Sequence, residues 1–158
     1  MASSNDKTGS LRSEHFASGP FRPHGSVEIW RDGSVVHLIA EGPFNTETVQ
    51  GVSRAMRELF AAQPPQGRFV DVLEMRTSIM ASMEVMSAFG RFLSEMSAAK
   101  TAPLAVAYVV APDVEGRGLM LPIFARVYAE NGRRFAAFET MSEARAWALE
   151  QLSAGGAT

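Results

Sequence analysis

The chain has no cysteine among its 158 residues and only three histidines, His15, His24 and His37. Without cysteine there are no disulfides, no thiolate nucleophile and no cysteine metal site, and three scattered histidines do not form one either. No apolar run approaches the roughly 18 residues that a membrane-spanning helix needs. We therefore expect no metal, no cofactor and no transmembrane segment.

Basic residues are not in excess. Lys and Arg number 15 against 17 Asp and Glu, a formal net charge of −2. A surface that binds nucleic acid must neutralise phosphates, so we expect no nucleic-acid partner. The first ten residues lack the apolar core of a signal peptide, and we expect a cytoplasmic protein.

The composition predicts one folded domain over residues 25–152. A hydrophobic content of 46% in 158 residues suffices for one compact α/β domain, whereas the chain is too short for two domains of ordinary size. Residues 1–24 are rich in Ser, Gly, Pro and charge, too polar to offset the entropy lost on ordering, so they are expected to form a disordered tail. Residues 153–158 are expected to be a disordered C-terminus.

Hydrophobic periodicity within the domain predicts five strands and four helices. The strands are expected near 27–31, 34–41, 69–73, 103–110 and 134–138, and the helices near 45–63, 80–99, 119–130 and 140–152. Asp32-Gly33 supplies the turn of a hairpin, and the wholly apolar run 103–110 is typical of a central parallel strand. The order β-β-α-β-α-β-α-β-α predicts an α/β fold with a mostly parallel five-stranded sheet and an N-terminal antiparallel hairpin strand.

Several residues mark the expected helix boundaries. Asn45 is suited to cap the first helix, and Thr140 with Glu143 forms a capping box for the last. Asn131-Gly132 is typical of a left-handed helix end. Pro122 fits only in the first turn of the third helix, because deeper it would remove a hydrogen bond.

Two segments carry a resemblance to a known family. Arg68-Phe69-Val70-Asp71-Val72 forms an expected strand, and Phe135-Ala136-Ala137-Phe138 precedes Glu143-Ala144-Arg145-Ala146-Trp147. With the element order, these segments resemble the STAS domain of sulfate transporters and anti-sigma factor antagonists. Over residues 26–152 the chain is similar to the sporulation antagonist-like branch, which is grouped with both STAS and CRAL-TRIO lipid-binding domains.

The STAS resemblance implies a non-enzymatic regulatory or protein-interaction module that contacts a protein partner or associates with itself, for example as a homodimer. The CRAL-TRIO resemblance implies an alternative, a binding protein for a small apolar or lipid-like ligand. An apolar cavity lined by Met and Phe side chains would favour the ligand-binding alternative. Exposed apolar residues on the second helix, with no deep pocket, would favour the interaction module.

Antagonist members of the family resemble one another in an Asp-Ser-Ser/Thr-Gly motif at the start of the second helix, where a partner kinase phosphorylates the serine. Alignment from Val70-Asp71-Val72 places Ile79-Met80-Ala81-Ser82 at this motif, with Met80 in the acceptor position. Ser78 and Ser82 flank it, but serine before a helix is typical of an N-cap. The resemblance therefore implies that the standard serine phosphoswitch is absent.

Five methionines crowd the same region, and methionine is common at adaptable binding surfaces. The spacing of Met83, Met86 and Met96 favours a stripe that faces the core, whereas Met75 and Met80 lie in the turn and have less reason to be buried. The surface around Met75, Met80 and Met83 is expected to include an exposed apolar patch for homodimer or partner contact.

The loop Glu115-Gly116-Arg117-Gly118 precedes a helix, so Gly116 and Arg117 are candidates for binding an anion. The loop lacks the Lys and Ser/Thr of a phosphate loop, which favours a plain flexible loop. The candidate binding residues are Met75, Ser78, Met80, Ser82, Met83, Gly116 and Arg117.

The sequence predicts no catalytic residue and no enzyme. Glu41, Asp71 and Glu74 are the acids with a chance of meeting at strand ends, and Asp71 is interpreted as a structural acid at the mouth of the sheet. His37 is interpreted as a partly exposed sheet residue. The pair Arg133-Arg134 is interpreted as a solvated strand start.

Overall fold

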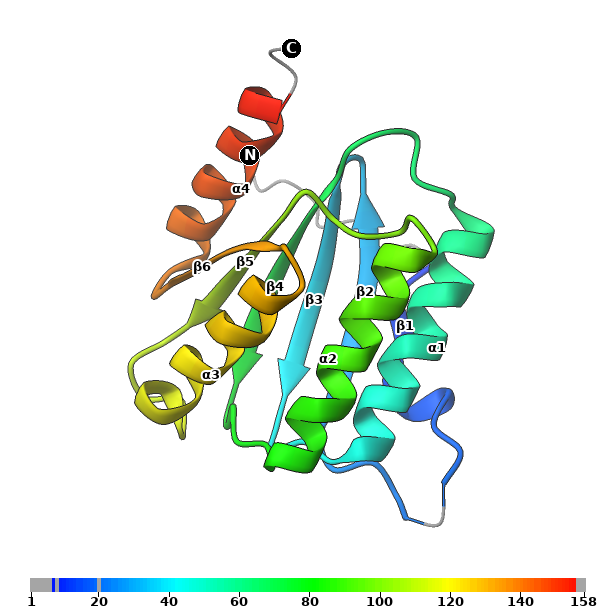
Figure 1. The fold of residues 1–158 in the computed structure, drawn as a ribbon, viewed down its shortest axis with the longest axis vertical. Helices are drawn as coiled ribbons and strands as arrows, with labels where there is room; N and C mark the ends of the chain where they lie inside the picture. Colours follow the sequence, from blue (N-terminus) through cyan, green and yellow to red (C-terminus); the bar gives the residue numbers. More distant parts are fainter. Residues whose placement is uncertain (1–6, 8, 20, 156–158) are drawn as a thin grey trace.

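The computed structural model describes residues 7, 9–19 and 21–155 (Figure 1). They form a six-stranded sheet with four α-helices, which confirms the predicted α/β class. The strands are β1 (Leu11–Arg12), β2 (Ser26–Asp32), β3 (Val35–Glu41), β4 (Val70–Arg76), β5 (Ala105–Val110) and β6 (Arg134–Phe138). The helices are α1 (Thr46–Ala62), α2 (Met83–Ala98), α3 (Arg117–Glu130) and α4 (Met141–Gly155), with a short 3₁₀ turn, η1, at Ser13–His15.

The sheet follows the chain order β1 to β6. β1, β2 and β3 pair antiparallel, and β3 to β6 pair parallel, as the predicted hairpin and crossovers require. β5 is the fifth of six strands, so the prediction that residues 103–110 lie in the middle of the sheet is wrong. Every residue of β5 is nevertheless buried, because one face packs in the larger core with α1 to α3 and the other packs against α4.

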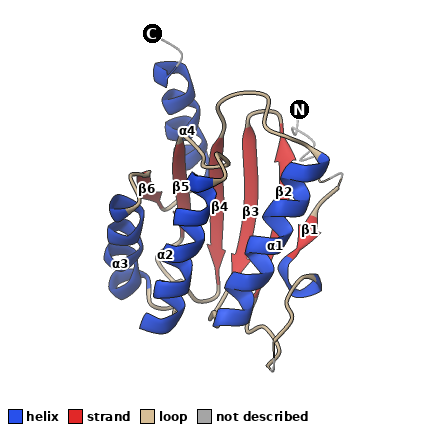
Figure 2. Ribbon diagram, turned by 45° about the vertical axis from the view of Figure 1, so that its right-hand side comes forward, coloured by secondary structure: helices blue, strands red, loops and turns tan. Residues whose placement is uncertain are grey.

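Helices α1, α2 and α3 cover one face of the sheet and α4 covers the other (Figures 1 and 2). Alternation along each strand assigns side chains to the two layers. On β4, Val70 and Val72 pack toward Ala144 and Ala148 of α4, while Leu73 belongs to the larger core under α1 to α3. The larger core contains a cavity between the sheet and these three helices.

The predicted turn and cap residues act as expected. Gly33 has a φ of 59° between β2 and β3, and Asn45 Oδ1 accepts a hydrogen bond from Thr48 N at 3.1 Å. Thr140 Oγ1 accepts one from Glu143 N at 3.3 Å and donates to its carboxylate. The expectation for Pro122 is wrong: α3 begins at Arg117, which places the proline in the second turn.

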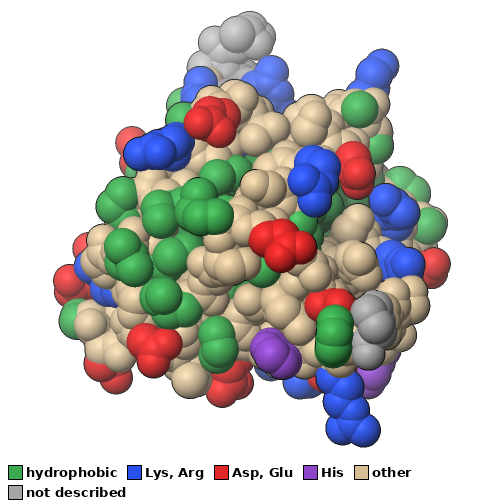
Figure 3. All heavy atoms as spheres, turned by 60° about the horizontal axis from the view of Figure 1, so that its bottom comes forward, with side chains coloured by type: hydrophobic (Ala, Val, Ile, Leu, Met, Phe, Trp, Pro, Cys, Tyr) green, Lys and Arg blue, Asp and Glu red, His purple; other side chains and the backbone are tan. Residues whose placement is uncertain are grey.

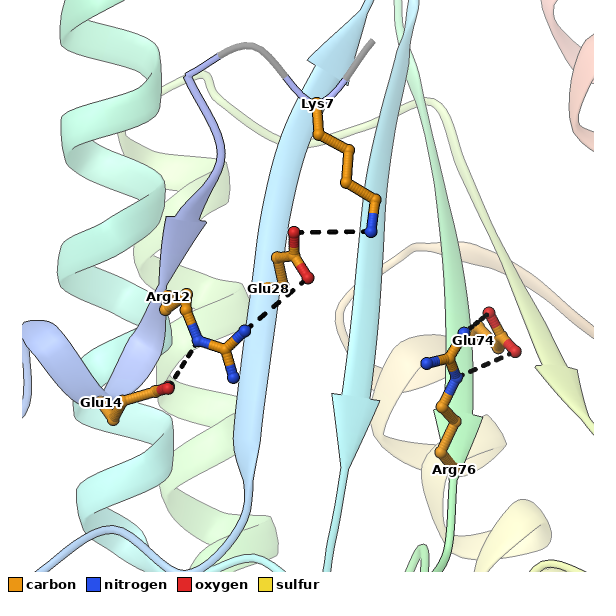
Figure 4. A network of polar contacts seen from close by, with 6 residues as sticks. All are labelled: Lys7, Arg12, Glu14, Glu28, Glu74 and Arg76. Carbon is orange, nitrogen blue, oxygen red and sulfur yellow. Dashed lines mark hydrogen bonds and ion pairs between the residues drawn. The ribbon is translucent and has the colours of Figure 1, made fainter. Parts of the chain in front are cut away.

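Residues 11–15 differ from the expected disordered tail, because they form β1 and η1. Leu11 and Arg12 pair with β2, and Ser13 is fully buried with its Oγ accepting a hydrogen bond from Val27 N at 2.9 Å. Lys7 and Arg12 reach the carboxylate of Glu28, at 3.6 and 3.9 Å (Figure 4). This segment therefore adds an edge strand to the sheet.

The expectations for the remaining terminal residues are only partly covered by the described residues. Residues 1–6, 8 and 20 of the expected tail, and 156–158 of the expected C-terminal end, lie outside the described residues. α4 runs to Gly155, past the predicted helix end at residue 152. None of the helices in the described chain combines the length and apolarity needed to cross a bilayer.

Candidate functional site

A cavity of about 90 Å³ lies between the sheet and helices α1, α2 and α3, and we call it the core cavity. Its lining is mostly apolar and includes four methionines and four phenylalanines: Met56, Met75, Met86, Met96, Phe44, Phe89, Phe92 and Phe124. Five polar or ionisable residues join them: Thr48, Asp71, Tyr108, Tyr128 and Arg133.

Helical spacing places the apolar lining. Val49, Val52 and Met56 lie three and four residues apart on α1, and Met86, with its i+3 neighbour Phe89, lines the cavity from α2. Strand alternation brings Leu38 of β3 and Leu73 of β4 into the floor. The same face contains Asp71, two residues before Leu73.

Four polar side chains of the lining form what we call the polar cluster: Asp71, Tyr108, Tyr128 and Arg133. The two tyrosine hydroxyls lie 2.8 Å apart and share a hydrogen bond. Arg133 donates from Nη2 to Leu93 O at 2.7 Å and to Ser97 Oγ at 3.1 Å. All four side chains are buried.

Two atoms of the polar cluster have unused hydrogen-bonding capacity. Asp71 Oδ1 and Arg133 Nη1 are both buried, and neither has a partner among the described residues. Buried polar atoms are nearly always hydrogen-bonded, because leaving one unpaired costs about 1–3 kcal/mol. An unpaired acceptor and an unpaired donor in one cavity lining therefore leave a place for a polar partner, either an ordered water or a polar group of a ligand.

Burial dominates the electrostatics of the polar cluster. It raises the pKa of Asp71 to about 7, an effect that the positive charge of Arg133 opposes. It also raises the pKa of the Tyr108 and Tyr128 hydroxyls, so both stay neutral. The pKa of Arg133 is lowered by burial and partly restored by Asp71.

The methionine expectations are partly corrected. Met75 is 5% exposed and lines the core cavity, because β4 continues to Arg76 and alternation turns Met75 inward. Met83 is 67% exposed, so its predicted place in the core-facing stripe is wrong. Met86 and Met96 are buried, as the stripe predicts. Met80 is half-buried and packs over Gly116.

The two serines beside the expected phosphorylation position have structural contacts. Ser78 is 2% exposed and its Oγ donates to Glu115 Oε1 at 2.9 Å. Ser82 is exposed and caps α2 by accepting a hydrogen bond from Val85 N at 3.2 Å. The structure thus shows the expected N-cap at Ser82.

Gly116 and Arg117, the two candidates for anion binding in the loop before α3, both contact other residues of the protein. Gly116 has a φ of 80°, and a Cβ at this position would clash with the Met80 side chain. Arg117 Nε donates to Val110 O at 3.0 Å, and its Nη2 lies 4.0 Å from the Glu139 carboxylate. Arg117 therefore connects α3 to the end of β5 and to Glu139, and these contacts involve only groups of the protein.

The acids at the strand ends stay apart. Glu74 pairs with Arg76 at 3.1 Å (Figure 4), and Glu41 accepts a hydrogen bond from Thr77 Oγ1 at 2.9 Å. Asp71 lies on the opposite face from Glu74, near the start of β4. The interpretation of Arg133 as a solvated residue is wrong, since only 8% of it is exposed, whereas Arg134 is exposed.

Sequence reasoning missed the polar cluster. The available signals were an acid inside the apolar run 69–73 and the two tyrosines, the only ones in the chain, which both lie in expected core elements. An acid or hydroxyl in an apolar run needs a polar partner, and the partners here come from β4, β5, α3 and the turn before β6.

A second hollow, of about 160 Å³, lies on the face that α4 leaves partly open. It is lined by Trp30 and His37, whose rings stack at 5.2 Å, and by Lys7 and Arg145. His37 is 3% exposed, so the expectation of a partly exposed residue is wrong. Burial lowers the pKa of His37, and Arg145 lowers it further.

The described residues hold no group of three or more His, Asp or Glu side chains placed to bind a metal ion. Comparisons with protein-family models, curated proteins and solved structures returned no match.

Proposed function

We propose that the protein binds a small apolar ligand in the core cavity, without catalysing a reaction. The observation that supports the proposal is a cavity lined by four methionines and four phenylalanines beneath α1 and α2. Ligand sites are concave and mostly apolar, with a few polar groups that fix orientation. The resemblance to lipid-binding CRAL-TRIO domains favours the same function.

The size of the cavity limits the ligand. An engineered apolar cavity of about 150 Å³ in another protein binds benzene. The core cavity, at about 90 Å³, accommodates a short aliphatic chain or a small ring. Methionine side chains have three rotatable bonds and can shift to enlarge the space, which suits the four that line this cavity.

Filling the cavity is expected to abolish binding. Val52 lines it from α1, so Val52→Phe places a ring in the ligand's space. In calorimetric titrations with 1-hexanol, we expect the wild type to bind and Val52→Phe to bind at least about tenfold more weakly. Val127→Phe is the matched control, because Val127 packs against the same core without lining the cavity.

The proposal would be contradicted if the wild type, Val52→Phe and Val127→Phe bound 1-hexanol with equal affinity. It would also be contradicted if both substitutions weakened 1-hexanol binding equally. Native mass spectrometry of freshly purified protein adds the number of copies and any retained ligand in one measurement.

A second candidate is the interaction module implied by the STAS resemblance, acting through self-association. Met83 is 67% exposed and Leu119 is 63% exposed, near the starts of α2 and α3. Figure 3 shows hydrophobic side chains gathered on the end of the molecule where these helices begin. The homodimer contact is expected at this exposed apolar surface around Met83 and Leu119. A dimer without a retained ligand in native mass spectrometry would favour this candidate.

A further inference from the structure

We propose that the ligand of the core cavity has a carboxylic acid head group, and that the protein takes up one proton when the ligand's carboxylate binds. This inference rests on the proposed function and specifies the chemistry of its ligand. It follows from the unpaired atoms of the polar cluster and from the charges in the cavity lining.

The polar cluster offers donors to a carboxylate. Arg133 Nη1 is buried, lines the cavity and has no partner in the described chain, while Nη2 is held by Leu93 O and Ser97 Oγ. The protein therefore holds the guanidinium through Nη2, while Nη1 is free to donate a hydrogen bond to a ligand. Charged donors of this kind bind carboxylates with short, strong hydrogen bonds.

The tyrosine pair supplies another donor. Two hydroxyl groups carry two protons, and the hydrogen bond between Tyr108 and Tyr128 uses one of them. The second proton is available to a group in the cavity. A carboxylate oxygen accepts readily, whereas an ammonium group or a purely apolar ligand leaves this donor unpaired.

Charge balance explains why Asp71 lies in the same lining. Asp71 and Arg133 are the acidic and basic residues of the cavity wall, so an ionised Asp71 and Arg133 together are neutral. A bound carboxylate adds a second negative charge, and two carboxylates in one buried site cannot both stay ionised. One proton from solvent then binds Asp71 Oδ1, and the ligand's carboxylate becomes the counter-ion of Arg133.

Asp71 is suited to accept that proton. Its pKa is already raised to about 7 by burial, so protonation near neutral pH costs little. Besides burial, the group that acts on it is Arg133, whose positive charge lowers the pKa of Asp71, and the charge of Asp71 in turn raises the pKa of Tyr108 on β5 and of Tyr128 on α3. α1 and α2 contribute only Thr48 to the polar part of the lining. No other residue of the described lining therefore titrates between pH 5 and 8.

The test compares hexanoate with 1-hexanol by isothermal titration calorimetry from pH 6 to pH 9. Hexanoate is expected to bind with uptake of about one proton above pH 7, so its affinity should fall about tenfold per pH unit there. The affinity for 1-hexanol is expected to stay constant, because the alcohol brings no charge. Repeating the titration in buffers of different ionisation enthalpy counts the protons.

Two substitutions assign the effect to residues. Arg133→Met is expected to weaken hexanoate at least about tenfold, with little change for 1-hexanol, and Arg134→Met is the matched control on an exposed neighbour. Asp71→Asn is expected to remove the pH dependence of hexanoate binding. If Arg133→Met fails to fold, Asp71→Asn still decides the question.

The outcomes separate the two proposals. If 1-hexanol binds and hexanoate does not, or if hexanoate binds without proton uptake, this inference is overturned and the proposed function stands. If neither compound binds the wild type, the proposed function fails as well. A pH dependence of hexanoate binding that persists in Asp71→Asn would also overturn the inference.

Discussion

Asp71→Asn is expected to make the ligand-free protein progressively more stable relative to the wild type as the pH rises from 4 to 8. The folded protein holds the Asp71 proton up to a pKa of about 7, whereas the ordinary value is 3.8. Below pH 4 the carboxyl group is protonated in both states, and the raised pKa has no effect on stability. Above pH 4 the unfolded chain releases the proton first, so the wild type loses stability until the folded state ionises as well.

The expected size follows from linkage. A shift of about three pKa units corresponds to on the order of 4 kcal/mol, lost between pH 4 and pH 7. Asparagine does not titrate, so urea unfolding should show a gap between variant and wild type that is smallest at pH 4 and largest at pH 8. The contribution of His37 is common to both proteins and cancels. Asp113→Asn, at an exposed loop position, is the control and should show no such gap.

A gap of the same size at every pH would contradict this account of Asp71. It would mean that the carboxyl group reaches solvent and titrates normally. The acceptor role assigned to Asp71 in the core cavity would then lose its basis.

Gly51→Ala is expected to destabilise the protein, against the usual preference of helices for alanine. Gly51 lies within α1, and a Cβ there would clash with the backbone oxygen of Ser13. Backbone cannot move aside as a flexible side chain can, so we expect a loss of about 1–3 kcal/mol from overpacking. Gly90→Ala is the matched control, because the nearest atom to its Cβ would be Val127 Cγ1 at an ordinary 3.7 Å.

Thermal unfolding distinguishes the two substitutions. Gly90→Ala should leave the midpoint unchanged or raise it, since alanine is favoured over glycine in helices by about 1 kcal/mol. Gly51→Ala should lower it by several degrees. If Gly51→Ala is as stable as Gly90→Ala, the segment around Ser13 contributes little to the fold, as the sequence prediction of a disordered tail assumed.

Local signals explain what could be predicted from the sequence. Hydrophobic periodicity, the Asp32-Gly33 turn and the Asn45 cap act within a few residues, and the structure shows each of them. The docked N-terminal segment gave no such signal. The docking of this segment involves one buried serine, Ser13, whose Oγ binds Val27 N. It also requires glycine at position 51, where a Cβ would clash with Ser13 O.

The candidate site depends on contacts between distant residues, which a single sequence does not show. Arg133 is buried because its guanidinium reaches Leu93 O, 40 residues away. Met75 is buried because β4 runs three residues further than its apolar run indicates. Met83 is exposed although it has helical spacing with Met86, because it is the first residue of α2.

The most direct test of ligand binding in the core cavity is methyl NMR of protein with ¹³C-labelled methionine, titrated with hexanoate at pH 6. Four methionines line the cavity, namely Met56, Met75, Met86 and Met96, whereas Met83 lies on the surface. We expect the methyl signals of these four to shift together and saturate, with the signal of Met83 unchanged. A shift of Met83 without the cavity methionines, or no shift in any of them, would contradict the account.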